Sequence, residues 1–128
     1  MGIYKSRINQ KSEMYILAPR VLPDGRFIFH QSVHERIKNK NVLLVVASMS
    51  TGATALGVMD CLEYYGCRLV GISAVFSAVE DINGRKIHAL FTKDDIPNYR
   101  FFIPSECEMC KEGRNIDAVF NSEGYTKL

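Results

Sequence analysis

The strongest hydrophobic pattern in the chain is a strand–helix–strand unit near its middle. Residues 42–47 form an uninterrupted apolar run that is short and rich in β-branched side chains, which predicts a buried strand. From Gly52 to Tyr65, apolar residues recur at three- and four-residue spacings and predict an amphipathic helix, which Gly66 ends. A second apolar run, 68–76, predicts another strand. Two strands joined by one helix form a βαβ unit, so we expect them to be parallel with a right-handed crossover.

Weaker patterns surround this unit. We expect short extended segments at 14–18, 27–29 and 100–103, a turn at 23–26, a loop at 80–85 and a third strand at 86–91. Ser32, with Glu35 three positions later, predicts a capping box for a short helix that ends at Ile37. We interpret the chain as one domain, 1–128, with a loose arm at 1–13 and a polar tail at 104–128 that contains a Cys-x-x-Cys pair.

The element order predicts an α/β fold: a small, mostly parallel sheet with flanking helices. Only one long helix is evident, whereas an all-parallel sheet needs cover on both of its faces. We therefore expect a partner subunit to bury the remaining face, most simply in a homodimer.

Composition narrows the function classes. The apolar fraction of 47% and the charged fraction of 23% are ordinary for a globular protein. The net charge is only +2, with scattered Lys and Arg, so nothing indicates a nucleic-acid partner. The chain has no apolar run of about 18 residues and no apolar signal core, which favours a cytoplasmic protein without a membrane partner. Gly2 and Ser6 match the loose myristoylation pattern, which also occurs often by chance.

The richest candidate chemistry follows the first core strand. Small and hydroxyl residues fill this turn before the helix: Ser48, Ser50, Thr51, Gly52, Ala53 and Thr54. No acidic residue lies between Val42 and Val58. Free backbone N–H groups and the positive end of the helix dipole should meet at this point, which predicts a phosphate site. The alternative is a hydroxyl-rich helix cap that only satisfies its own N–H groups.

This segment resembles the phosphoribosyl-pyrophosphate-binding motif of type I phosphoribosyltransferases. In that motif a hydrophobic strand leads through two adjacent acidic residues into a Thr-Thr-Gly-x-Thr-like loop. Here the loop is Ser50-Thr51-Gly52-Ala53-Thr54, and the two acidic positions hold Val46 and Ala47. The family's carboxylates grip the ribose hydroxyls, so the resemblance implies a retained 5′-phosphate site and a lost ribose clamp.

The resemblance extends to the tail and is closest to the C-terminal part of orotate phosphoribosyltransferases. Pro104, Cys107, Cys110 and Gly113 reproduce a Pro-x-x-Cys-x-x-Cys-x-x-Gly segment seen in part of that group. The similarity covers residues 42–113. The family's N-terminal hood, which supplies pyrophosphate and base contacts, is not matched.

Cys107 and Cys110 also have the spacing of half a tetrahedral zinc site, for which Zn²⁺ would need two further ligands. A disulfide or simple thiols are the alternatives. Cys61 and Cys67 are expected to be core thiols. His30 and His34 lie four apart, and a solvated helix face is favoured over a metal pair.

Two functions follow. The first is a phosphoribosyltransferase-like protein of nucleotide metabolism that binds a phosphate-bearing small molecule without full transferase activity. The second is an active orotate-type transferase, a glycosyltransferase that uses phosphoribosyl pyrophosphate and Mg²⁺ and is completed by a partner chain. The absence of carboxylates at Val46 and Ala47 favours the first.

Overall fold

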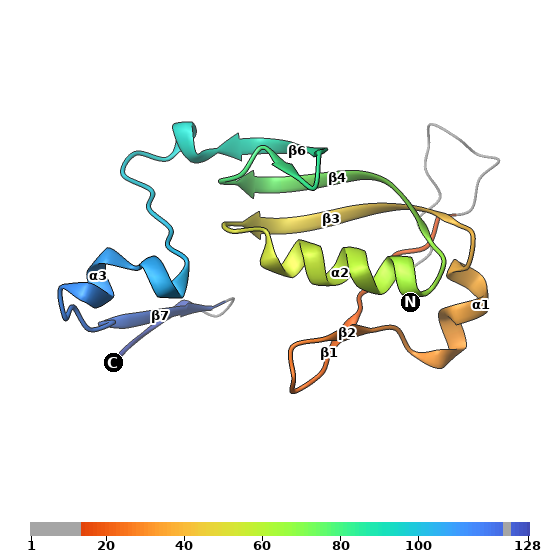
Figure 1. Ribbon diagram of the computed structural model, residues 1–128, viewed down its shortest axis with the longest axis horizontal. Helices are drawn as coiled ribbons and strands as arrows, with labels where there is room; N and C mark the ends of the chain where they lie inside the picture. Colours follow the sequence, from red (N-terminus) through yellow and green to blue (C-terminus); the bar gives the residue numbers. More distant parts are fainter. Residues whose placement is uncertain (1–13, 122–123) are drawn as a thin grey trace.

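A four-stranded, mostly parallel sheet forms the centre of the protein (Figure 1). The computed structural model describes residues 14–121 and 124–128, so the predicted arm 1–13, with Gly2 and Ser6, lies outside the described residues. The strand order is β3 (Asn41–Met49), β4 (Arg68–Ser77), β6 (Arg85–Thr92) and β5 (Asp81–Ile82). The β3–β4 and β4–β6 pairs are parallel, and β5 runs antiparallel to β6. The predicted α/β class with a mostly parallel sheet is confirmed.

Helix α2 (Ala53–Tyr64) covers one face of this sheet, below the strands in Figure 1. Its buried side chains are Ala55, Val58, Cys61 and Leu62, which follow the three- and four-residue spacing of the sequence. Gly66 ends the helix with a φ of 68°, and the Cys67 N–H returns to the Leu62 carbonyl at 2.9 Å, as in a left-handed cap. The predicted strand–helix–strand unit is therefore confirmed with small shifts in its bounds.

Two buried clusters hold α2 on the sheet. The first joins the start of α2 to the sheet and consists of Met49, Ala55, Ile72, Ala74, Ile82 and Ile87. The second joins the other end of α2 to the N-terminal segment and consists of Phe29, Ile37, Val58, Cys61 and Leu62. The first cluster therefore supports the candidate site directly.

The N-terminal segment corrects two predictions. Only Tyr15 of the expected 14–18 strand takes part in a bridge, and the regular strands here are β1 (Arg20–Val21) and β2 (Phe27–Ile28), an antiparallel pair around the predicted turn. The expected capping box is wrong, because a 3-10 turn η1 (Gln31–Val33) precedes a shorter helix α1 (His34–Ile37). The His30 ring accepts the Ser32 N–H at 3.2 Å and lies 2.9 Å from the Ser32 hydroxyl, so His30 takes the capping role.

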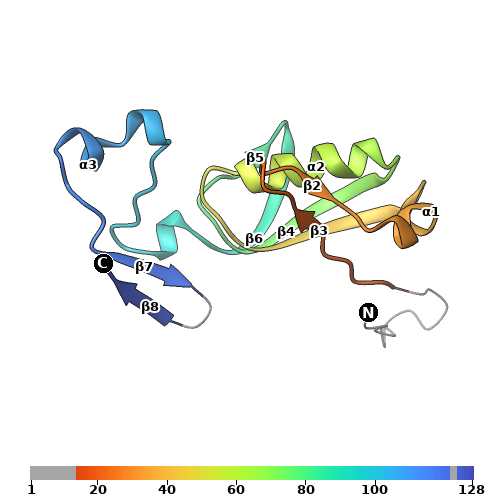
Figure 2. The ribbon, with the colours of Figure 1, turned by 90° about the horizontal axis from the view of Figure 1, so that it is seen from below.

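The segments after β6 contain elements that the sequence did not predict. The 3-10 turns η2 (Lys93–Asp95) and η3 (Pro104–Glu106) lead to the short helix α3 (Glu108–Lys111). An antiparallel hairpin of β7 (Ala118–Asn121) and β8 (Gly124–Lys127) ends the chain. The expected extended run at 100–103 has no strand pairing. These segments lie beyond the carboxyl ends of β3, β4 and β6 (Figures 1 and 2).

None of the helices within residues 14–121 and 124–128 combines the length and apolar character needed to cross a bilayer.

Candidate phosphate-binding site

The candidate site lies where β3 turns into α2. Strand β3 ends at Met49, and α2 begins at Ala53, so only three residues connect them. This turn is at the carboxyl end of the parallel strands, where open α/β sheets bind their ligands. All six predicted site residues border one shallow cavity of about 70 Å³ there. The structure thus brings together Ser48, Ser50, Thr51, Gly52, Ala53 and Thr54.

The first turn of α2 leaves donors unused. Its cap residue, Gly52, has no side chain to accept a hydrogen bond. The Ala53 N–H donates to the Thr51 hydroxyl at a long 3.4 Å. Within the part of the chain that the structure describes, the Thr54 and Ala55 N–H groups have no acceptor. Ala55 is only 1% exposed, so its N–H is a buried donor without a partner. It can donate a hydrogen bond to an anion in the cavity.

Gly52 gives the turn its shape. Its φ of 82° belongs to the left-handed region, which side chains with a Cβ disfavour. A Cβ at this position would also lie 2.8 Å from Cδ1 of Ile82, a core residue on β5. The Ala78 N–H donates to the Met49 carbonyl at 2.8 Å, so the loop after β4 holds the end of β3. These contacts with Ile82 and Ala78 hold the turn in its conformation without a bound ligand.

Three hydroxyl groups border the cavity without a partner among the described residues. Ser48, Ser50 and Thr54 are exposed, and none of their hydroxyls has a hydrogen bond to another described residue. Hydroxyls can donate to the oxygens of a phosphate group. The volume suits one such group, because pockets for whole drug-sized ligands measure about 300–1,000 Å³.

Val46 and Ala47, which stand just before the turn, differ in their surroundings. Val46 is half-buried, packs on the first core cluster and borders the cavity. Ala47 is exposed. Neither side chain can accept a hydrogen bond from a sugar hydroxyl or bind a divalent cation. The cavity therefore has donors for an anion but no carboxylate beside them.

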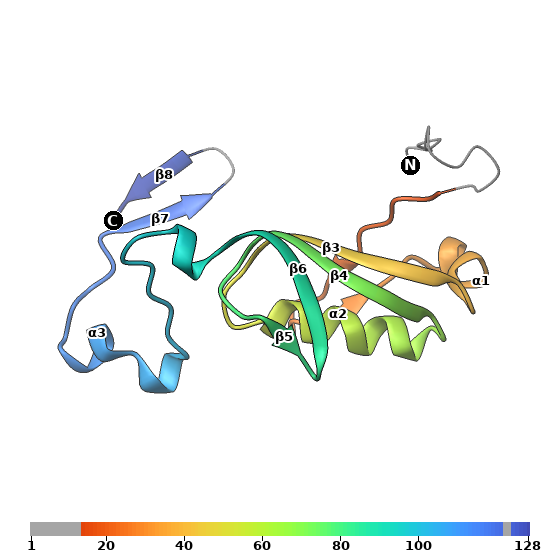
Figure 3. The ribbon, with the colours of Figure 1, turned by 90° about the horizontal axis from the view of Figure 1, so that it is seen from above.

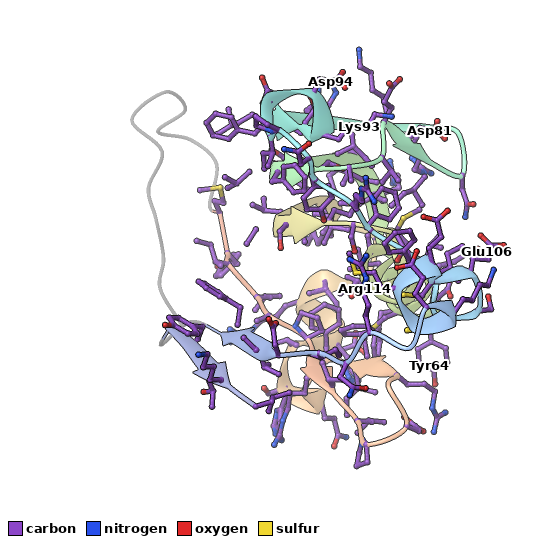
Figure 4. All side chains as sticks on the ribbon, turned by 90° about the vertical axis from the view of Figure 1, so that its left-hand side faces the viewer. Tyr64, Asp81, Lys93, Asp94, Glu106 and Arg114 are labelled. Carbon is purple, nitrogen blue, oxygen red and sulfur yellow. The ribbon has the colours of Figure 1, made fainter. Side chains whose placement is uncertain are left out.

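A second cavity, which sequence reasoning missed, lies between the loop after β4 and the η2 turn. It measures about 230 Å³ and is bordered by charged residues of both signs, among them Glu80, Lys86, Lys93 and Asp94. Figure 4 shows Lys93 and Asp94 on the η2 turn and Asp81 on the neighbouring β5 segment. No sequence motif marked these residues, because they come from separate loops that only the fold brings together. The mixed charges do not select one ligand.

The Cys107–Cys110 pair lies apart from this cavity, at α3. The Cys110 N–H donates to Cys107 Sγ at 3.4 Å. Hydrogen bonds from the Cys110 side chain and backbone lower the pKa of Cys107, whereas the neighbouring Cys107 raises the pKa of Cys110. All four cysteines are free thiols. Among the described residues no third His, Cys, Asp or Glu joins them, so a zinc ion would need ligands from elsewhere.

The other candidate residues have structural surroundings. His34 Nε2 lies 2.9 Å from the Phe29 carbonyl, and the His30 ring caps η1, so neither joins a group of potential metal ligands in the described chain. Cys61 is buried, and the Cys67 thiol donates to the Ile37 carbonyl at 3.4 Å. Burial raises the pKa of both thiols, which suits the predicted core role.

Comparisons with known proteins do not assign this site: no family model, no curated protein and no solved structure matches the chain.

Proposed function

We propose that the protein binds the phosphate group of a phosphate-bearing small molecule, such as a phosphoribosyl compound, at the turn between β3 and α2. One observation supports the proposal: among the described residues, the N–H groups of Thr54 and Ala55 and the hydroxyls of Ser48, Ser50 and Thr54 have no partner, and these four residues all border one small cavity. Backbone N–H groups at the start of a helix attract anions through hydrogen bonds and through the helix dipole. The resemblance to the phosphoribosyl-pyrophosphate motif agrees with a 5′-phosphate as the anion.

The residues that precede the turn argue against transfer chemistry in the isolated chain. Glycosyl transfer develops positive charge on the ribose, which an enzyme stabilises with groups positioned for that charge. Val46 and Ala47 supply no carboxylate for the ribose or for Mg²⁺. We therefore propose a binding protein without full transferase activity.

The test is a titration of the purified protein with inorganic phosphate, ribose 5-phosphate and phosphoribosyl pyrophosphate, with and without Mg²⁺. Isothermal calorimetry should detect binding of ribose 5-phosphate that does not depend on Mg²⁺. If none of the three compounds binds, the phosphate site is refuted. Tight binding of phosphoribosyl pyrophosphate that requires Mg²⁺, or formation of orotidylate from orotate, would support the active transferase instead.

The Thr51→Asp substitution tests the location of the site. Aspartate can still accept the Ala53 N–H, so the turn should persist, but its negative charge repels an anion in the cavity. We expect ribose 5-phosphate to bind more than tenfold more weakly. Thr126→Asp, which introduces the same charge on the exposed strand β8, should leave the affinity unchanged. Equal affinities of Thr51→Asp and the wild type would place the site elsewhere.

A further inference from the structure

The face of the sheet opposite α2 has no helix over it among the described residues, and Figure 3 views the molecule from that side. We call it the outer face. The register places Val45, Ser73 and His88 side by side across its centre. The exposed large apolar side chains on this face are Leu90 (76%), Val45 (69%), Val70 (60%), Leu43 (57%) and Val75 (49%).

A β-bulge explains why Val70 joins this set. Val42 pairs with Leu69, but the next residue of β3, Leu43, pairs with Gly71, so Val70 is the extra residue of β4. After the bulge, Ile72 and Ala74 point into the core and Val75 is exposed. A Cβ on Gly71 would lie 3.2 Å from the Leu43 side chain, so these strands present a closely packed apolar surface.

Parallel strands of this composition are normally buried on both faces. Here β3 and β4 carry aliphatic side chains on both, but α2 covers only one. Contiguous exposed apolar surfaces of this kind mark interaction sites. The outer face therefore has the composition of an interface.

The accessible area shows that the chain as a whole exposes more surface than a compact monomer of its mass. The chain exposes 10723 Å², whereas a compact monomer of 14.5 kDa exposes about 6,900 Å². If the fifteen residues outside the described ranges are counted at the full area of an unfolded chain, an excess of about 2,000 Å² remains. An obligate dimer buries about 1,000–2,500 Å² on each partner. The outer face and the segments after β6 both contribute to this excess, which is of the size that one such interface removes.

We propose that a second copy of this chain covers the outer face, so that two sheets stack through Leu43, Val45, Val75 and Leu90. The centre of the face carries uncharged Ser73 beside His88, and none of its exposed apolar positions is next to an acidic residue in the sheet register. Because this surface has no charge pattern, it offers nothing that would select an oppositely charged partner. A two-fold axis brings the same apolar surface of two copies together, and two such surfaces are complementary. Face-to-face sheets pack about 10 Å apart through such side chains.

The chain's own segments are poorer occupants. Residues 93–121 and 124–128 lie beyond the carboxyl ends of the strands, away from this face (Figures 1 and 3). Residues 1–13 contain few large apolar side chains, chiefly Met1, Ile3 and Tyr4, among Lys, Arg, Asn and Gln. A different protein as the occupant would leave the purified chain monomeric, which the experiment below detects.

The test is the mass of the purified full chain in solution, measured by sedimentation velocity at about 5 to 100 µM with a reductant and a chelator present, because dimer formation depends on protein concentration. Under these conditions neither a disulfide nor a metal bridge through Cys107 and Cys110 can join two chains. We expect the wild type to be a dimer. A monomeric wild type across this range would overturn the proposal.

The Val45→Lys substitution locates the interface. Because Val45 is exposed, lysine should not disturb the core of one chain, but two desolvated charges at the centre of the interface should shift the dimer to monomer by at least a hundredfold in dissociation constant. Val119→Lys on strand β7 makes the same change outside the outer face and should remain dimeric. If Val45→Lys fails to fold, as judged by circular dichroism, Leu90→Lys decides the question instead. A folded Val45→Lys or Leu90→Lys variant that stays dimeric would show that another surface joins the chains.

Discussion

Two separate constraints act on Gly52 at the candidate site. One is its left-handed backbone, with a φ of 82°, and the other is the contact that any side chain would make with Ile82. Ile82 is itself buried in the first core cluster, so it cannot turn aside without disturbing Met49 and Ala55. The conformation that exposes the N–H groups of α2 therefore depends on a residue about thirty positions further along the chain.

These two constraints can be measured separately. Gly25 has the same φ of 82°, but a Cβ there would meet no atom within 4 Å. Gly25→Ala should therefore lower the free energy of unfolding by about 1–2 kcal/mol through backbone strain alone. Gly52→Ala should cost about 1–3 kcal/mol more because of the contact with Ile82. Urea unfolding of both variants measures the difference, and equal losses would show that Ile82 gives way freely.

A second prediction about single residues concerns the reactivity of the Cys107 thiol. Since the Cys110 side chain is the main group that lowers the pKa of Cys107, Cys110→Ala should raise that pKa. Less thiolate would then be present at pH 7, and Cys107 should react more slowly with iodoacetamide. Mass spectrometry of the labelled peptide follows the rate across pH. Cys61→Ala is the control, because Cys61 is buried elsewhere, and an unchanged rate in Cys110→Ala would refute the role of Cys110.

At the scale of elements, the sequence predicted best where periodicity was long. Strand β3, helix α2 and strand β4 follow apolar runs or spacings that pack on one another, so local pattern and tertiary contact agree. The 14–18 segment has an apolar run too, but only Tyr15 takes part in a bridge, and a strand requires a continuous neighbour. Ser32 fits a capping box by sequence, yet its hydroxyl lies beside the His30 ring.

The short elements were not predicted, because they are too short or too exposed to carry a regular hydrophobic pattern. Strand β5 has two residues, and only its Asn83-Gly84 turn, with both φ values positive, marks the hairpin with β6. The β7–β8 hairpin exposes Val119, Phe120 and Tyr125, so burial does not impose an alternation on its sequence. The six predicted site residues border one cavity because they lie close together in the sequence. The sequence did not indicate Met49 and Ala55, which also border it, or the support from Ile82, which depends on the fold.

The connection between β4 and β5 gives a prediction for an element. Ser77 is only 2% exposed, and its hydroxyl donates to the Val79 carbonyl at 2.7 Å and accepts the Val79 N–H at 3.4 Å. Ser77→Ala leaves both Val79 groups without these bonds, so it should lower the free energy of unfolding by about 1–3 kcal/mol. Thermal unfolding measures the loss. Ser105→Ala, at an exposed position in η3, should be neutral, and a neutral Ser77→Ala would refute the role of this turn.

At the scale of the whole molecule, the core is small relative to the surface. Helix α2, the four-stranded sheet and the N-terminal segment with α1 enclose two clusters, whereas the outer face and the segments after β6 expose large apolar side chains. Association would stabilise such a chain by burying this apolar area, because burial of apolar area is the main favourable contribution to folding and to association. The proposed dimer therefore makes folding and assembly one equilibrium, in which the folded state depends on protein concentration.

That coupling gives a measurement independent of molecular mass. If two chains unfold and separate together, the unfolding temperature of the wild type should rise by about 3 °C for each tenfold increase in protein concentration. Scanning calorimetry or circular dichroism over two decades of concentration, in reductant and chelator, measures this slope. Val45→Lys should unfold at a lower temperature with no slope, because its folded chains do not associate, whereas Val119→Lys should keep the wild-type slope. A wild-type unfolding temperature that does not depend on concentration would mean that the outer face adds nothing to stability in this range.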